Sequence, residues 1–215
     1  MIMIISTMLK QLPDPFHLLP LGAAVPFRLQ AGETLFRNGE LSQGCYFLEH
    51  GEVRLIRWSR DGGETVIHVA RPGETFAEAA LFSPAYHCDA VASTGASGQL
   101  LRKAAIDSLL GSDAAFVRAL TARLARQVQA LRRTVEIMGI KPAGERVMAA
   151  LSQYENAGSG QYENLPPLKT LAAQIGLTHE ALYRTIARLV RQGALVKTGR
   201  GLVQLPPVDH VRKSD

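Results

Sequence analysis

The chain has 215 residues and a formal net charge of +5, and 47% of its residues are hydrophobic. This length holds one large or two small domains with buried cores, and the composition excludes a globally disordered chain. The two cysteines, Cys45 and Cys88, exclude a disulfide framework and a four-ligand zinc or iron–sulfur site, so we expect a cytoplasmic protein. The apolar opening MIMIISTML is too short to span a membrane and follows no basic residues, so we predict neither a signal peptide nor a membrane partner.

The N-terminal half has the pattern of a compact β-domain. From Phe27 to Leu101, short β-prone runs alternate with glycine turns, and the clearest predicted strands are Cys45–Leu48, Val53–Trp58, Thr65–Val69 and Ala90–Ala92. Asp61–Gly63 predicts a hairpin turn between the second and third of these strands. Evenly spaced short strands predict an antiparallel sandwich or small barrel rather than a βαβ fold. The sequence has no Ser-His-Asp, paired-carboxylate or Walker arrangement, so we do not expect an enzyme.

An uninterrupted helical pattern follows from Ala114 to Met138, after an N-cap signal at Ser112–Asp113. Its apolar residues recur every three or four positions as one stripe: Val117, Leu120, Leu124, Val128, Leu131, Val135 and Met138. A helix of about 25 residues spans roughly 37 Å, and a narrow stripe of this length is typical of a coiled coil. We therefore predict a homodimer interface; a stripe packed wholly on the N-terminal domain is the alternative. Gly139–Pro142 ends the helix and predicts a hinge.

The C-terminal part carries the positive charge. Residues 1–111 contain 9 Lys+Arg and 11 Asp+Glu, whereas residues 139–215 contain 10 and 6. We predict helices over Glu145–Tyr154, over Leu168–Gln174, and from the N-cap Thr178 to Gly193, with a tight turn at 176–178. Two β-prone runs, 194–196 and 202–205, predict a hairpin after the last helix, which completes the pattern of a winged helix-turn-helix.

The exposed face of this last helix favours contact with DNA bases. Arg184 can donate to guanine O6 and N7, and Glu180 can accept from the amino group of cytosine, whereas a carboxylate on a surface for phosphates alone would be repelled. We predict base contacts from His179, Glu180, Tyr183 and Arg184, and phosphate contacts from Thr170, Thr178, Arg188, Lys197 and Arg200. The alternative is that Glu180 only complements the helix dipole and Arg184 is solvated.

Three stretches carry a resemblance to a known family: GETLFRNGE (32–40), GCYFLEHGEV (44–53) and GETFAEAALF (73–82). Together with the long helix and the helix-turn-helix, they resemble the cAMP receptor protein/FNR (Crp/Fnr) superfamily over roughly residues 16–205. The resemblance implies an α+β chain with an N-terminal antiparallel β-roll (1–111), a dimerisation helix (112–138) and a C-terminal winged helix-turn-helix (139–215). It implies a homodimeric transcription regulator that binds double-stranded DNA at an inverted repeat with TGA-like half-sites, contacts RNA polymerase, and senses an unknown small-molecule effector.

The effector motif departs from the cAMP-binding pattern. The resemblance places the effector pocket at Glu78, Ala79, Ala80, Cys88, Asp89 and Leu131. Glu78 matches the ribose-binding glutamate, but Ala77 replaces a glycine, and Cys88–Asp89 replace the Arg-Ser pair that holds the cyclic phosphate. Asp89 would repel a phosphate, and Leu131 stands where a hydroxyl for the adenine is expected, so cAMP is disfavoured. Iron–sulfur and haem are disfavoured as well, because the cysteine and histidine ligands of those family members are missing here, and we predict no metal site.

Two other functions remain open. The chain could be a cyclic-nucleotide-binding regulatory module without DNA binding, or a redox- or metal-responsive variant that uses Cys88 and His87. Adjacent strand residues point to opposite faces, which favours a buried Cys88 beside an exposed His87 over a shared metal.

For the regulator we expect a population shift, in which an effector changes the pairing of the long helices and the 139–142 hinge reorients the DNA-binding heads; constitutive DNA binding is the alternative.

Overall fold

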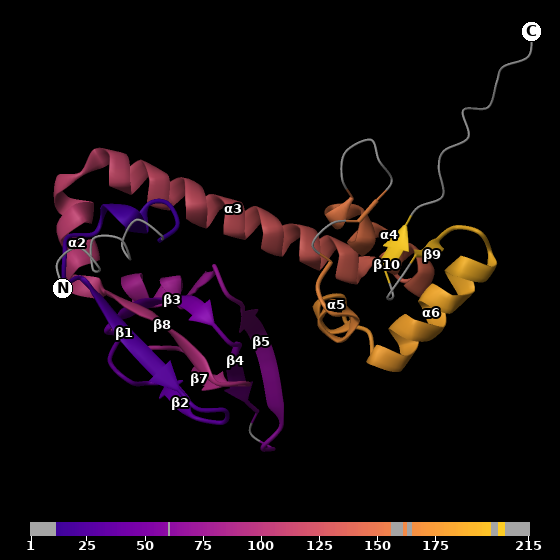
Figure 1. The fold of residues 1–215 in the computed structure, drawn as a ribbon, viewed down its shortest axis with the longest axis horizontal. Coiled ribbons are helices and arrows are strands. Elements are labelled where there is room, and N and C mark those ends of the chain that lie inside the picture. Colours follow the sequence, from indigo (N-terminus) through magenta and orange to yellow (C-terminus); the bar gives the residue numbers. More distant parts are fainter. Residues whose placement is uncertain (1–11, 60, 156–160, 163–164, 199–201, 205–215) are drawn as a thin grey trace, which may run out of the picture. The chain divides into compact units, whose positions relative to one another are not determined.

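A computed structural model gives the structure of the protein and describes residues 12–59, 61–155, 161–162, 165–198 and 202–204 (Figure 1). The chain divides into two compact units, Met1–Leu124 and Ala125–Asp215. The first unit has two hydrophobic core clusters, and the second unit has one.

Two four-stranded sheets form the first unit, and every strand pairing in them is antiparallel. The first sheet has the order β1-β8-β3-β6 and the second has the order β2-β7-β4-β5. The strands are β1 (Ala24–Leu29), β2 (Thr34–Phe36), β3 (Gly44–His50), β4 (Val53–Trp58), β5 (Glu64–Ala70), β6 (Thr75–Phe76), β7 (Asp89–Ala92) and β8 (Ala96–Arg102). The predicted N-terminal antiparallel domain is confirmed.

Strand β3 explains why this part of the sequence is almost wholly apolar. Successive side chains of a strand point to opposite faces, so Tyr46 and Leu48 enter the core between the two sheets. Cys45 and Phe47 enter a second core on the other face, together with Phe116 and other helical side chains. Because both faces are covered, β3 carries apolar residues at consecutive positions. Cys45 is fully buried.

The helices of this unit cover the first sheet. They are the 3-10 turns η1 (Phe16–Leu18) and η2 (Glu78–Phe82), the helix α2 (Lys103–Ser112), and the beginning of α3 (Ala114–Gly139). The α2 helix was not predicted: it follows β8 directly, and among its residues only Ile106 is fully buried, so its apolar periodicity is weak. The predicted N-cap of α3 is confirmed, because Asp113 Oδ1 accepts hydrogen bonds from the N–H groups of Ala115 and Phe116 at 2.8 and 3.0 Å.

The second unit contains the end of α3 and a helical core. Its elements are α4 (Ala143–Leu151), η3 (Ser152–Tyr154), α5 (Leu168–Gln174), α6 (His179–Arg191), β9 (Val196–Thr198) and β10 (Leu202–Gln204). The predicted bounds of α5 are confirmed, and the predicted 145–154 helix divides into α4 and the 3-10 turn η3. The hairpin β9–β10 begins later than predicted, because Leu195 is buried in the helical core instead of pairing in the hairpin.

Arg146 holds the predicted hinge segment against this core. Its Nε donates to the carbonyl of Ile140 at 2.7 Å, and its Nη1 donates to the carbonyl of Ile175, at the end of α5, at 3.3 Å. The guanidinium thus satisfies backbone acceptors at two helix ends. None of the helices in the described part of the chain is both long enough and apolar enough to cross a bilayer.

Candidate functional site

The α6 helix presents a polar face that its own core fixes in place. The Thr178 hydroxyl caps the helix by accepting from the Ala181 N–H at 3.1 Å. One face is buried in the core of the second unit through Leu182, Ile186 and Leu189. The residues on the opposite face are exposed: His179, Glu180, Tyr183, Arg184, Ala187, Arg188 and Arg191. This face is the candidate nucleic-acid interface.

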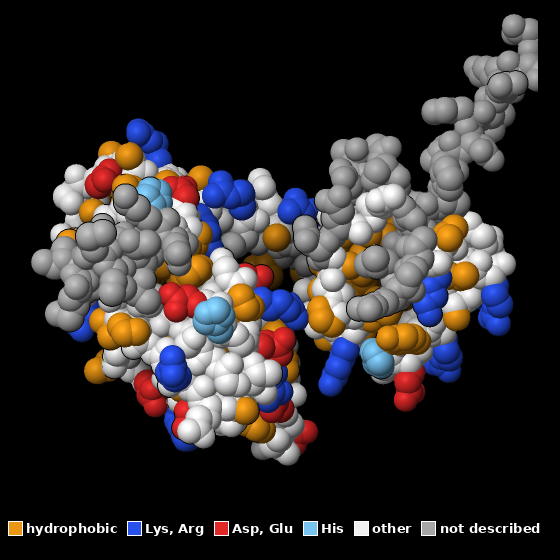
Figure 2. All heavy atoms as spheres, viewed as in Figure 1, with side chains coloured by type: hydrophobic (Ala, Val, Ile, Leu, Met, Phe, Trp, Pro, Cys, Tyr) orange, Lys and Arg blue, Asp and Glu red, His pale blue; other side chains and the backbone are white. Residues whose placement is uncertain are grey.

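Glu180 and Arg184 lie one helical turn apart, and neither makes an ion pair with a described residue. Figure 2 shows basic, acidic and histidine side chains together on the part of this unit where α6 lies. Two oppositely charged groups that do not neutralise each other remain available to hydrogen-bond a ligand. The rings of His179 and Tyr183 contact each other edge to face, with centroids 4.5 Å apart, and this contact orders both side chains.

The predicted phosphate contacts are in different environments. Lys197 is exposed on β9, and Thr178 is exposed while its hydroxyl oxygen caps α6. Thr170 is half-buried in α5. Arg188 lies against α4, because a Cβ added to Gly144 would be 3.0 Å from Arg188 Nη2. Arg200 lies outside the described residues.

The apolar stripe of α3 divides into a buried part and an exposed part. Leu120 is 1% exposed and packs in the second core of the first unit, with Val117 and Leu124 half-buried. The prediction that Leu120 belongs to a dimer interface is therefore wrong, since its side chain already contacts its own domain. The later stripe residues are all at least 46% exposed: Val128, Leu131, Val135 and Met138.

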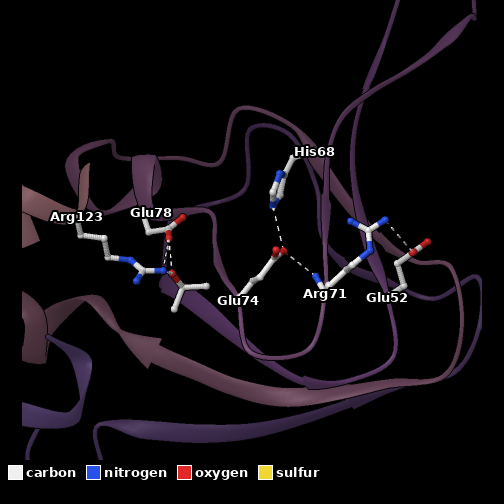
Figure 3. Close-up of polar contacts among 7 residues, drawn as sticks. Glu52, His68, Arg71, Glu74, Glu78 and Arg123 are labelled. Carbon is white, nitrogen blue, oxygen red and sulfur yellow. Dashed lines mark hydrogen bonds and ion pairs between the residues drawn. The ribbon is translucent and has the colours of Figure 1, made fainter. Parts of the chain in front are cut away.

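A buried polar cluster lies where the resemblance places the effector glutamate (Figure 3). Glu78 is 7% exposed, and its Oε1 lies 3.7 Å from Nη2 of Arg123. The Thr75 hydroxyl donates to Glu78 and accepts from Arg123. Arg123 belongs to α3, so this cluster ties the start of α3 to the segment after β6. Arg123 and Thr75 were missed as site residues, because an arginine beside an apolar stripe gives no signal of a buried partner.

The other predicted effector residues have different environments. Ala79 is exposed and Ala80 is buried, on η2. Leu131 belongs to the second unit and is 66% exposed. Asp89 is half-buried, and both of its carboxylate oxygens accept hydrogen bonds from protein N–H groups, those of Asn38 and Trp58. Aromatic rings occupy the core between the sheets: Tyr46 stacks on Phe36 and Phe76 with centroids 5.4 and 5.3 Å apart.

Cys88 and His87 have the environments that favour a structural role. Cys88 is 2% exposed, and burial raises the pKa of its thiol, with a smaller opposing effect of Arg57. His87 is exposed. Among the residues that the structure describes, no three His, Cys, Asp or Glu side chains are grouped closely enough to hold a metal ion.

Comparison with known proteins gives consistent matches. Residues 26–113 match the family described as the cyclic nucleotide-binding domain. The cyclic AMP receptor protein of Thermus thermophilus is 27% identical over 175 residues, which cover 81% of this chain and 80% of that protein. The nitrogen fixation regulation protein FixK of Bradyrhizobium diazoefficiens is 25% identical over 193 residues, which cover 87% of this chain and 80% of the relative. The structure of FixK2 from Bradyrhizobium japonicum matches with a TM-score of 0.63 and 25% identity, over 85% of this chain and 92% of that one. These relatives are regulatory proteins.

Proposed function

We propose that this chain, which belongs to the cAMP receptor protein/FNR superfamily of transcription regulators, binds double-stranded DNA sequence-specifically as a homodimer. One observation carries the proposal: α6 holds Glu180 and Arg184 exposed and free of ion pairs with described residues, on a capped helix whose other face is buried. A helix placed in this way can enter a major groove as a rigid body. The α5–α6 pair with the β9–β10 hairpin is then a winged helix-turn-helix.

Base recognition follows from hydrogen-bond chemistry. The guanidinium of Arg184 donates to O6 and N7 of a guanine, and the carboxylate of Glu180 accepts from N4 of a cytosine. These contacts suit a G·C pair within a TGA-like half-site. The ordered pair of His179 and Tyr183 contacts the outer bases of the half-site.

Phosphate contacts supply affinity without specificity. Lys197, Thr170, Thr178 and Arg200 are the candidates, and Arg188 contributes only if its side chain leaves α4. The excess of basic residues in 139–215 supports this assignment, since the attraction to DNA is concentrated in the segment that holds α6.

The dimer interface is proposed for the later part of the α3 stripe. The exposed β-branched residues Val128 and Val135 alternate with Leu131 and Met138 at three- and four-residue steps. β-Branched side chains at one set of core positions and unbranched ones at the other favour a parallel, two-stranded coil. A parallel pair has its twofold axis along the helices, so both α6 helices lie at the same end and contact half-sites about 34 Å apart.

The first unit is proposed to hold the effector-responsive part of the regulator, with RNA polymerase as the downstream partner. An effector other than cAMP is supported by Ala77 at the glycine position and by an Asp89 carboxylate already engaged with Asn38 and Trp58. Its signal would change the packing of the paired α3 helices and reorient the DNA-binding heads at 139–142.

A binding titration tests the proposal. Duplexes selected from a random library are expected to contain an inverted repeat, and Arg184→Ala is expected to cost about 1–3 kcal/mol and to relax preference at one base pair. Arg118→Ala, at an exposed position on α3 outside the proposed interface, is the control and should leave that preference unchanged. A uniform loss over all sequences would place Arg184 on a phosphate. If the chain bound no duplex at all, the regulatory module without DNA binding would be the better description.

A further inference from the structure

One cavity in the first unit lies at the end of the second sheet. It has a volume of about 370 Å³, and its walls include Asn38, Arg57, Trp58, His87 and Asp89. This volume is within the range of sites that hold small organic molecules, roughly 300–1,000 Å³. The lining side chains come from three separate segments, β4, the start of β7, and the turn after β2.

Hydrogen bonds fix the walls of this cavity. Asp89 accepts from the Asn38 backbone N–H through Oδ1 at 2.7 Å and from the Trp58 indole N–H through Oδ2 at 2.9 Å. The Nε of Arg57 donates to the carbonyl of His87 at 3.0 Å. The indole ring and the guanidinium are therefore held in defined orientations before any ligand arrives.

Several hydrogen-bonding groups at the cavity remain unused by the described part of the chain. These are both Nη groups of Arg57, the side-chain amide of Asn38 and the imidazole of His87. The ring of Trp58 is 56% exposed although its N–H is bonded to a carboxylate, so an aromatic plane remains open to a ligand. A donor fork, an amide and a fixed aromatic plane together suit a flat molecule with hydrogen-bonding edges.

The charges decide which flat molecule fits. Arg57 and Asp89 have opposite charges that offset each other, and both oxygens of Asp89 already accept hydrogen bonds. A bare phosphate would be attracted by the Arg57 guanidinium and repelled by the Asp89 carboxylate. A neutral ring with two adjacent acceptors can accept hydrogen bonds from both Nη groups of Arg57 without being repelled by Asp89. A guanine-type edge has these acceptors at O6 and N7, and nucleobases stack on aromatic side chains and guanidinium planes.

We propose that this cavity binds a planar heterocycle of the guanine type, held by the Arg57 fork and the Asn38 amide and stacked on Trp58. The proposal deepens the effector role proposed for the first unit. It involves neither Glu78 nor Leu131, so the ligand does not occupy the position of a cyclic nucleotide against the buried glutamate. Ligand binding is measured without DNA. A failure to bind the ligand would therefore leave the DNA-binding proposal intact, and a failure to bind DNA would leave the ligand proposal intact.

Trp58 is the only tryptophan in the 215-residue chain, so indole fluorescence of the full-length protein reports on this cavity alone. The probes are guanosine 5′-monophosphate, uridine 5′-monophosphate and inorganic phosphate, at constant ionic strength. The guanine nucleotide is expected to give a saturable change. Uridine monophosphate, whose carbonyls flank an N–H donor, should bind roughly tenfold more weakly, and phosphate should give no saturable change.

Variants separate the ligand contacts from the fold. Arg57→Lys keeps the charge and removes the donor fork, so guanine-nucleotide binding should weaken roughly tenfold by calorimetry, while Arg28→Lys on β1 should bind as the parent does. Asn38→Ala removes only the side-chain amide, since Asp89 accepts from the backbone N–H of this residue, and should weaken binding several-fold. Equal affinities for phosphate and the guanine nucleotide, or parent-like binding by both Arg57→Lys and Asn38→Ala, would overturn the proposal.

Discussion

Ala77 has a backbone conformation that costs free energy. Its φ is +63°, and it is the only residue other than glycine with a positive φ in the described part of the chain. The left-handed region brings Cβ close to the following carbonyl, which costs roughly 1–2 kcal/mol for an L-residue and almost nothing for glycine. Ala77 precedes η2 and Glu78, so the strain lies directly at the predicted effector segment.

Ala77→Gly is therefore expected to raise the free energy of unfolding by about 1 kcal/mol, after allowance for the greater freedom of glycine in the unfolded chain. Urea denaturation measures the change. The matched control is Ala79→Gly, two residues later in η2, where φ is negative and glycine should destabilise by roughly 0.5–1 kcal/mol. Destabilisation by both variants to the same extent would show that the strain at Ala77 is absent in solution.

The two cysteines are expected to react slowly. Burial raises the pKa of Cys88 and raises that of Cys45 further, and the thiolate is the reactive form. In the folded chain, alkylation at neutral pH should be on the order of a hundredfold slower than in urea for both residues. The folded rates should continue to rise with pH above the ordinary thiol pKa, where those of the unfolded chain level off, because the folded thiols lose their protons at higher pH.

Mass spectrometry of the Cys45 and Cys88 peptides follows both reactions in one experiment. Cys88 should react faster than Cys45, since it lines an open cavity while Cys45 is fully buried. A Cys88 that reacted at neutral pH as rapidly in the folded chain as in urea would favour the redox-responsive alternative.

At the scale of the element, α6 depends on the contacts of its first turn. The N–H groups in the first turn of a helix have no acceptor within the helix, and the Thr178 hydroxyl accepts from one of them, the N–H of Ala181. The Thr185 hydroxyl donates to the Ala181 carbonyl at 2.7 Å. These contacts order the turn that carries His179 and Glu180. Helix stability and the geometry of the proposed DNA interface are therefore coupled at this end.

Thr178→Ala is expected to destabilise the protein by about 1 kcal/mol, because the capping acceptor is lost. It should also weaken DNA binding, since the first turn of α6 would be less ordered. Thr178→Ser is the control: its hydroxyl can cap the helix, so both the unfolding free energy and the DNA affinity should be close to those of the parent. Equal losses in the two variants would indicate that the methyl group of Thr178, rather than its oxygen, is what matters.

At the scale of the whole molecule, the burial pattern of α3 divides the helix into two parts. Its first turns bury Phe116 and Leu120 against the first unit, and its later turns expose Val128, Leu131 and Val135. Apolar residues that recur along one face of a helix without a partner favour association with a second copy. The exposed part is where a dimer would bury the most new apolar surface.

Leu131→Asp is expected to convert the proposed dimer to a monomer, because two carboxylates would be buried across the twofold axis. Leu131 is 66% exposed in the single chain, so the fold of the monomer should be preserved. Analytical ultracentrifugation gives the mass, and a titration with an inverted-repeat duplex should show weaker binding. Gln129→Asp, at an exposed position on α3 outside the stripe, should leave both properties unchanged. Identical masses for the two variants would contradict the assignment of the stripe.

A structural feature can be predicted from the sequence when the residues that determine it are close together along the chain. Helix α5, the Thr178 cap, the Asp113 cap and the β4–β5 hairpin were predicted correctly, since each depends on residues within a few positions of one another. Helix α2 and the start of β9 were not, because packing of Ile106 and Leu195 in the cores overrides a weak local pattern. The exposed pair of Glu180 and Arg184 could be found from helical spacing alone.

The sequence by itself determined the antiparallel character of the N-terminal strands, the long helix after them and the polar face of α6. Only the tertiary structure decided which part of the α3 stripe is buried, which partner holds Glu78, and whether Asp89 is available to a ligand. Helical and strand periodicity are properties of neighbouring residues. In contrast, the contact of Glu78 with Arg123 joins residues 45 positions apart, and the bond from Asn38 to Asp89 joins residues 51 positions apart. Such contacts exist only once the chain has packed, so no local pattern can specify them.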